Sequence, residues 1–336
     1  MRYRLTSKVK KRLCIIFLNL ASTRFAGLFF KLTKRKFISD RTSRLANVWW
    51  YGYLLNFAVH LDVEAIRGKN LPKRRVRTLM PDFDWFLFYN TVFQLDCISH
   101  ILYELAVGYI PIIDDTYGVW DQFFEQPIVS LEPNEKKEEI VLSNEPSTLY
   151  TPTLISYCKL VRKLWSRLIK DFCRLNKQEN QYIEDEVSQI LGKGSRVLAI
   201  VCRGTDYKTA NMAKQPEVCD VIADAKKWMS KYNYDKIYLA TEEEAIYDQF
   251  VLAFPNKILV NKRTYYDKAM KEQNVKWIGQ VNFDRENDNY LKGLEYLSSI
   301  IIVSRCKALL GGNCGASNMA LLYNGEEYER FKIYDL

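Results

Sequence analysis

Residues 197–207 read VLAIVCRGTDY, an unbroken apolar run that ends in an arginine, a glycine, a threonine and an aspartate. An unbroken apolar run of this length is typical of a strand that is buried on both faces of a parallel sheet. Ligands of such sheets bind at the carboxyl ends of the strands, which is where the polar residues of this stretch lie. We therefore expect the stretch to supply a strand of an α/β domain and part of its functional site.

Further apolar runs in the C-terminal half alternate with helical patterns. The predicted strands are residues 196–202, 236–240, 257–260 and 307–310. The predicted helices are residues 216–232, 243–254 and 289–305, with a last one after Gly315. This alternation predicts a doubly wound parallel sheet that is covered by helices on both faces.

The N-terminal half reads mainly as helices, at residues 44–63 and 93–107. Gly108 and the apolar stretch 109–114 follow the second of these helices. A helix, a glycine stop and a short apolar strand in this order are typical of an α/β step. We therefore expect this half to be an α/β domain as well.

The length of the chain favours two domains. It has 336 residues, of which 48% are hydrophobic, and this length exceeds the usual size of one domain. Residues 153–191 read as one or two helices that bridge the domains, and the polar stretch 131–152 is expected near a domain boundary. We place an N-terminal domain at residues 1–170 and a C-terminal domain at residues 171–336.

Three polar segments follow predicted strands and are expected at one edge of the sheet. Arg203 offers a planar fork that pairs bidentately with the oxygens of a diphosphate. The glycines after the fourth strand let the backbone approach a ligand closely, and the next helix begins with free N–H groups that suit a phosphate. The predicted nucleotide-binding residues are Arg203, Gly204, Thr205, Thr241, Gly311, Gly312, Asn313, Gly315, Ser317 and Asn318.

Each of these segments also has a simpler interpretation. The residues after position 202 fit an ordinary strand-to-helix turn, capped by Thr205 or Asp206, as well as they fit a binding site. The acids 242–244 are typical of the first turn of any helix, and the glycine-rich turn matches no known phosphate-binding motif. The acidic pair at 114–115 suits a plain strand end better than a metal or sugar site. It is the three segments together that favour nucleotide binding.

Cysteines and charge restrict the class of protein further. The eight cysteines form no CxxC pair and several lie in apolar runs, so we interpret them as thiols in a reducing compartment rather than as disulfides. His60 and His100 have no cysteine at ligand spacing, which argues against a structural zinc site. The formal net charge of +9 suits anionic partners such as nucleotides, nucleic acids or acidic membranes.

The N-terminus combines a basic stretch, residues 1–12, with a short apolar run, residues 13–21. This order resembles a signal peptide, but more cations follow closely and no clear cleavage site is present. Two alternatives stay open. Residues 1–36 form either an amphipathic helix packed on its domain or an interfacial helix, with Phe17, Phe25, Phe29 and Phe30 facing lipid. No apolar run is long enough to predict a spanning helix.

The stretch 197–207 resembles the first motif of the fucosyltransferase-like superfamily of glycosyltransferases, a strand that ends in His-x-Arg-Arg-x-Asp. Arg203 matches the first arginine of this motif and Asp206 matches its aspartate. Val201 stands where histidine is usual, and Gly204 stands where a second arginine is common.

Other segments resemble this superfamily as well. Residues 237–242 are similar to its second motif, with Glu242 at the place of an aspartate, and residues 304–317 to its third, a strand followed by a loop of small residues. Residues 44–47 open a helix as a Gly-Leu-Gly-Asn turn does in bacterial fucosyltransferases. Residues 108–114 and 120–127 resemble segments of proteins from bacterial surface-polysaccharide clusters.

The resemblance implies a GT-B fold with two Rossmann-like domains. It implies a GDP-sugar donor such as GDP-fucose, bound as a substrate and not as a cofactor, and inverting transfer without a metal. Arg203 would neutralise the departing diphosphate, and Asp206, Glu242 or Glu295 would deprotonate the acceptor.

The implied acceptor is a glycan or a lipid-linked oligosaccharide at the cytoplasmic face of the plasma membrane, with no nucleic-acid partner. In the N-terminal domain, aromatic residues are candidates for stacking on sugars, although most aromatic residues in such runs belong to the core. These candidates are Trp49, Trp50, Tyr51, Trp120 and Phe124.

Two other classes of protein remain as alternatives. A pI of about 9.0 and many aromatic residues also fit a nucleic-acid-binding protein, although no known nucleic-acid motif is present. A nucleotidyl or phosphoryl transferase would need a metal site, for which the sequence gives no pattern.

Overall fold

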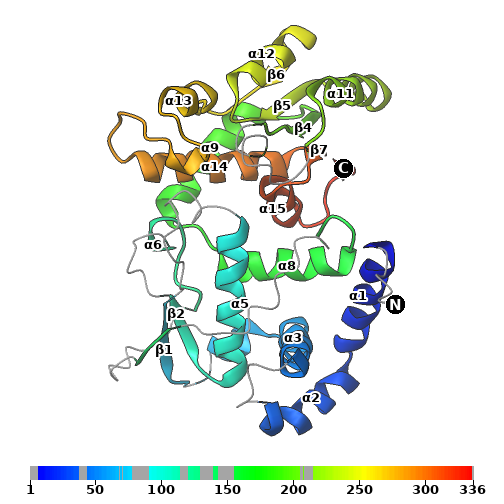
Figure 1. The fold of residues 1–336 in the computed structure, drawn as a ribbon, viewed down its shortest axis with the longest axis vertical. Helices are drawn as coiled ribbons and strands as arrows, with labels where there is room; N and C mark the ends of the chain where they lie inside the picture. Colours follow the sequence, from blue (N-terminus) through cyan, green and yellow to red (C-terminus); the bar gives the residue numbers. More distant parts are fainter. Residues whose placement is uncertain are drawn as a thin grey trace. The chain divides into compact units, whose positions relative to one another are not determined.

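A computed structural model describes residues 7–37, 44–67, 69, 71–77, 91–113, 120–128, 139–142, 155–204, 207 and 215–334. The chain divides into two compact units, of which the first comprises residues 1–81 and 95–174 and the second comprises residues 82–94 and 175–336 (Figure 1). The functions that the sequence suggests for the two halves stay predictions.

The second unit is built on a five-stranded parallel sheet. Its strands are β4 (Val197–Val201), β5 (Lys236–Ala240), β6 (Ile258–Leu259), β7 (Ala308–Gly312) and β8 (Arg330–Tyr334). Their order across the sheet is β6-β5-β4-β7-β8. The chain therefore runs from β4 outward to β6 and then returns to add β7 on the other side of β4, which places the switch point of the sheet between β4 and β7.

Helices cover both faces of this sheet (Figure 1). On one face, Leu198 and Ile200 belong to a buried cluster with side chains of α11 (Val218–Tyr232) and α12 (Glu244–Ala253). On the other face, Tyr238 donates a hydrogen bond to Ser299 of α14 (Asp288–Arg305). Helices α9 (Lys177–Leu191) and α15 (Gly315–Asn324) pack against α14. The predicted doubly wound parallel sheet is confirmed.

The four predicted strands and the helices between them are present, but three elements of this unit were not predicted. They are the helix α13 (Asp267–Glu272), the 3₁₀ turn η2 (Ile278–Gln280) and the edge strand β8. The sequence of β8 is RFKIY, and most of its residues are only partly buried. A short edge strand with two cations lacks the unbroken apolar run that marks the inner strands.

The first unit also has a parallel sheet, with the order β2-β1-β3. Its strands are β1 (Lys73–Arg77), β2 (Ile110–Ile113) and β3 (Glu139–Leu142). Helix α5 (Thr91–Val107) ends before Gly108, whose φ of 102° favours glycine, and β2 follows. The predicted step of helix, glycine and strand is confirmed, and both units are α/β.

One expectation for this unit is wrong. Residues 131–152 were predicted to be a polar loop near a domain boundary, but β3 lies inside this stretch and pairs with β1. Its residues Ile140, Val141 and Leu142 form a short apolar run that the surrounding charged residues masked in the sequence. The boundary between the compact units lies later, after Arg174.

The remaining helices of the first unit are α1 (Ser7–Ala21), α2 (Arg24–Phe37), α3 (Arg44–Val59), α4 (Val63–Arg67), α6 (Trp120–Phe123) and α8 (Lys159–Phe172). The predicted single N-terminal helix is thus two helices, α1 and α2, and both pack against α3. Phe30, predicted to face lipid in one alternative, instead packs edge-on against Trp49 and is 7% exposed.

Four of the five aromatic residues that were candidates for stacking on sugars belong to the core. Trp49, Trp50, Trp120 and Phe124 are all buried. A buried ring presents no face to a ligand, so these side chains stabilise the fold instead.

Candidate functional site

The register of the sheet brings the three predicted polar segments to one level. Val201 at the end of β4 pairs with Ala240 of β5 and with Gly311 of β7. Two residues further along each strand stand Arg203, Glu242 and Asn313. Because the strands are parallel, these residues lie side by side at the carboxyl edge, on both sides of the switch point.

Arg203 lies buried at this edge, with 8% of its surface exposed. Its Nε lies 3.4 Å from Oε2 of Glu242, and its guanidinium lies 4.8 Å from the centre of the Tyr207 ring. Burying a guanidinium is costly unless charged or polar groups compensate for the lost water. The arginine is therefore held in place by partners from the chain and is not a surface residue.

The charge of Arg203 affects the pKa values of side chains on two other elements. Burial raises the pKa of the Tyr296 hydroxyl on α14, and the nearby guanidinium of Arg203 opposes this shift. Burial likewise raises the pKa of the Cys314 thiol in the turn before α15, and Arg203 again opposes it. Arg203 thus lies at the centre of groups from β4, β5, α14 and the β7–α15 turn.

The turn after β5 is fixed by Arg263. The guanidinium of Arg263 donates a short hydrogen bond from Nη1 to the carbonyl of Thr241 and another from Nε to Asn261. The side chain of Thr241 is buried and accepts a hydrogen bond from the N–H of Glu243. The predicted binding residue Thr241 therefore uses its hydroxyl inside the turn.

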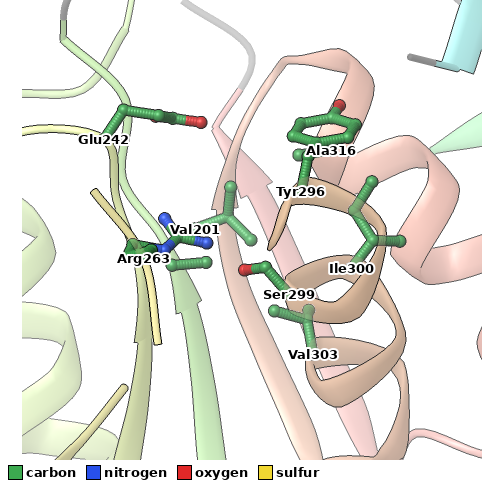
Figure 2. A pocket seen from close by; sticks show the side chains of 9 residues that line it. Val201, Glu242, Arg263, Tyr296, Ser299, Ile300, Val303 and Ala316 are labelled. Carbon is green, nitrogen blue, oxygen red and sulfur yellow. The ribbon is translucent and has the colours of Figure 1, made fainter. Parts of the chain in front are cut away.

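A cavity opens beside Glu242 at this edge (Figure 2). It encloses about 270 Å³, counted with the space that is open to solvent. Glu242 and Arg263 line one side of it, and side chains of α14 line the other, among them Tyr296 and Ser299. Figure 2 shows the carboxylate of Glu242 extending toward the α14 side. A second cavity shares three of these lining residues, and its lining consists of Glu242, Arg263, Thr264, Tyr266, Lys292, Glu295 and Tyr296.

Glu295 lines this second cavity, but both of its carboxylate oxygens are engaged. Oε1 accepts a 2.6 Å hydrogen bond from Arg285, and Oε2 accepts one from the N–H of Thr264 at 3.3 Å. These two contacts fix the orientation of the Glu295 carboxylate. Glu242 lines both cavities and pairs with Arg203.

The glycines of the site make room for side chains of the chain itself. A Cβ on Gly311 would lie 2.4 Å from Oγ of Ser317, and one on Gly312 would lie 2.0 Å from Oε1 of Gln215. A Cβ on Gly204 would meet the carboxylate of Glu243 at 2.2 Å. None of the three has a positive φ. Close packing, and not a left-handed backbone, requires glycine here.

The turn before α15 supplies the remaining predicted residues. Ser317 is fully buried, and its hydroxyl contacts the Cys314 thiol at 3.5 Å, so this hydroxyl faces the protein interior. Asn318 is 5% exposed, and its Oδ1 has no hydrogen-bond partner among the described residues. Gly315 and Asn313 are half-buried, and the carbonyl of Asn313 accepts a hydrogen bond from Gln215.

Several predicted residues lie outside the part of the chain that the structure describes. They are Thr205 and Asp206 of the first segment and the acidic pair Asp114 and Asp115. Asp206 as the base that deprotonates the acceptor therefore stays a prediction.

Sequence reasoning missed Arg263, which lines both cavities. It follows the very short strand β6 by several residues and belongs to no motif. An arginine shortly after a predicted strand of the same sheet was the available signal, since all such positions share one edge.

Within the described ranges, no group of three or more His, Cys, Asp or Glu side chains is placed to hold a metal ion. The metal independence implied by the resemblance stays a prediction.

Comparison with known proteins gives structural likeness only. No protein-family model and no curated protein matches the chain. Among solved structures, NodZ α-1,6-fucosyltransferase soaked with GDP-fucose has a TM-score of 0.44 and 13% identity, over 79% of this chain and 96% of that one. A mutant of Arabidopsis thaliana FUT1 in complex with GDP has a TM-score of 0.46 and 9% identity, over 88% of this chain and 80% of that one.

A third similar structure is POFUT1 in complex with GDP, with a TM-score of 0.40 and 10% identity, over 79% of this chain and 99% of that one. All three of these similar structures are fucosyltransferases. Likeness at these scores and identities does not show a shared function.

Proposed function

We propose that this chain is a glycosyltransferase that takes a sugar from a nucleoside diphosphate and places it on a glycan or a lipid-linked oligosaccharide. The observation that carries the proposal is the buried Arg203 at the switch point of a parallel sheet, paired with Glu242 and facing the β7–α15 turn. Parallel sheets of this kind bind nucleotides at that point. A buried guanidinium there suits a diphosphate because its fork matches phosphate oxygens.

In this reaction the bond between the sugar carbon and the diphosphate oxygen breaks, and a bond from the acceptor oxygen to that carbon forms. Negative charge grows on the departing diphosphate, where Arg203 stabilises it. The acceptor hydroxyl gives up its proton to a base within hydrogen-bond reach. Glu242 is our candidate for this base among the described acids, and Asp206 is the alternative.

Finer points of the proposal rest on the resemblance of the motifs. They are a GDP-sugar donor, inversion at the sugar carbon and transfer without a metal, in the synthesis of a surface polysaccharide. We place the protein in the cytoplasm, at the inner face of the plasma membrane. The acceptor would be bound by the N-terminal unit.

Ligand-induced stabilisation tests the proposal directly. Thermal unfolding is followed with GDP, UDP, CDP and ADP and their sugars, with and without Mg²⁺. A nucleotide that binds only the folded state raises the unfolding temperature by mass action. We expect one diphosphate to stabilise the wild type without Mg²⁺ and to have no effect on Arg203→Ala.

Arg196→Ala is the matched control. Arg196 lies directly before β4, at the opposite end from Arg203, and pairs on the surface with Glu329 at 2.8 Å. We expect the nucleotide response of this variant to equal that of the wild type. No response to any nucleotide, or an equal loss in both variants, would refute the diphosphate site.

A nucleic-acid-binding protein remains the competing class because of the basic pI. Binding to RNA or DNA that falls steeply with salt, together with no nucleotide response, would favour it.

A further inference from the structure

The first two helices expose an unusual amount of apolar surface. Six of the thirteen large apolar side chains that are exposed among the described residues lie on α1 and α2. They are Ile16 (55%), Leu20 (62%), Phe25 (82%), Leu28 (56%), Phe29 (52%) and Leu32 (76%). Exposed apolar side chains gathered in this way mark a surface that binds another apolar body.

On α2 these side chains form one continuous stripe. Phe25, Leu28, Phe29 and Leu32 occupy positions i, i+3, i+4 and i+7, so they share one face of the helix. Residues 16 and 20 repeat the pattern on α1 at a spacing of four.

The opposite faces of both helices are packed into the first unit. Phe30 is buried against Trp49, and Trp49 donates a hydrogen bond from Nε1 to Thr33. Asn56 donates to the carbonyls of Ala21 and Thr23 and so ties the link between the helices to α3. The exposed stripe therefore belongs to helices that are held firmly on their other side.

Cations accompany the stripe. Residues 1–39 contain eleven Lys and Arg and no Asp or Glu. Arg24 and Lys31 are exposed and lie along one side of the α2 stripe, and Arg12 is exposed one turn before Ile16. This charge is complementary to anionic lipid headgroups, while the apolar stripe matches the acyl region just below them.

We propose that the exposed faces of α1 and α2 bind the surface of an anionic lipid bilayer, with Phe25, Leu28, Phe29 and Leu32 below the headgroups. The phosphates of a nucleic acid would pair with the cations, but a nucleic acid has no apolar surface that would bury the leucine side chains. No single described helix is long and apolar enough to cross a membrane, whereas α1 and α2 together reach that length but are bent by 77°. The proposal is independent of the glycosyltransferase activity.

Vesicle cosedimentation of the full-length protein, without any donor or acceptor, tests it. The vesicles contain phosphatidylcholine alone or phosphatidylcholine mixed with phosphatidylglycerol. We expect binding to the mixed vesicles, much weaker binding to the neutral ones and release by high salt. Equal binding to both vesicles, or none to either, would overturn the proposal.

Two pairs of variants separate the apolar and charged contributions. Phe25→Ser with Leu32→Ser, and Arg24→Gln with Lys31→Gln, should each lower the partition coefficient by about tenfold or more. The matched controls are Val251→Ser with Leu252→Ser, exposed apolar residues of α12, and Lys226→Gln with Lys271→Gln, exposed cations of the second unit. Both controls should bind as the wild type does.

The same measurements distinguish a bilayer surface from other binding partners of α1 and α2. Dimerisation that the Phe25 and Leu32 variants abolish, together with no vesicle binding, would assign the surface to a second copy of the chain. Retention on vesicles in high salt and at alkaline pH would indicate a membrane-embedded hairpin instead. Tighter binding to RNA than to anionic vesicles would contradict the lipid assignment.

Discussion

At the scale of single residues, the site depends on two arginines and one glutamate. Arg203 pairs with Glu242. Arg263 donates a hydrogen bond to the carbonyl of Thr241, the residue before Glu242. Both cations therefore hold the turn after β5. A diphosphate bound at this edge would lie within a field that both of them create.

Arg263→Ala is expected to weaken binding of the stabilising diphosphate by about tenfold or more, because a charge-assisted hydrogen bond is lost. Isothermal titration measures this change. Lys262→Ala is the control, since its side chain is exposed and adjacent in sequence. Unchanged affinity in Arg263→Ala would assign this arginine to the fold alone.

Gly312 shows how tightly the glycine-rich turn packs. Gly312→Ala would displace Gln215 and break its hydrogen bond to the carbonyl of Asn313. We expect the free energy of unfolding to fall by about 1 kcal/mol. In a Gln215→Ala background, Gly312→Ala should lower the free energy of unfolding very little further, since both substitutions remove the same contact. Additive losses in the double variant, measured by urea unfolding, would contradict this account.

At the scale of elements, the N-terminus of α14 is fixed by an ionic network. Asp288 accepts hydrogen bonds from Arg285 and from the N–H of Phe283, and it pairs with the buried Lys292 at 3.0 Å. Lys292 also donates to the carbonyl of Val281. This network connects the loop before α14 to the helix that lines the cavity.

The network predicts a dependence of stability on pH. Burial alone would raise the pKa of Asp288, but hydrogen bonds from Arg285, Lys292 and Phe283 outweigh it, so the pKa is lowered. A lowered pKa stabilises the fold above about pH 4, and this stabilisation is lost as the pH falls through the folded-state value.

Asp288→Asn should therefore reduce the free energy of unfolding by about 3 kcal/mol at neutral pH, because the buried amine of Lys292 loses its carboxylate partner. The difference from the wild type should shrink in acid. Urea unfolding at pH 7 and at pH 3 measures both. A difference that stays constant with pH would refute the ionic account.

At the scale of the whole molecule, most cysteines are part of the two cores. Of the seven cysteines whose side chains the structure describes, six are buried and Cys219 is exposed. Burial raises the pKa of the Cys173 and Cys306 thiols. Their reactivity therefore reports on whether the fold is intact.

A thiol reagent should label Cys219 of the native protein rapidly, and Cys219→Ser should take up one equivalent less. The six buried cysteines should react only after unfolding in guanidinium. Mass spectrometry of digests locates each label. Rapid labelling of Cys202 or Cys314 in the native state would contradict the packing of the candidate site.

The amino-acid sequence by itself determined the parallel sheet of the second unit and the place of Arg203 in it. Unbroken apolar runs reveal buried strands, and the residue after a run must lie at the edge of the sheet. These are local properties, which neighbouring residues suffice to establish. Where the local pattern was weak, as in β3 and β8, the prediction failed.

Only the tertiary structure decided which residues meet. Arg263 joins the site because β6 pairs beside β5. The glycines of the site are explained by Gln215, Ser317 and Glu243, and Phe30 faces α3 and not the exterior. Such contacts join residues far apart in the chain, and their geometry depends on strand register and helix packing. A sequence pattern contains the periodicity of an element but not the identity of the surface that packs against it.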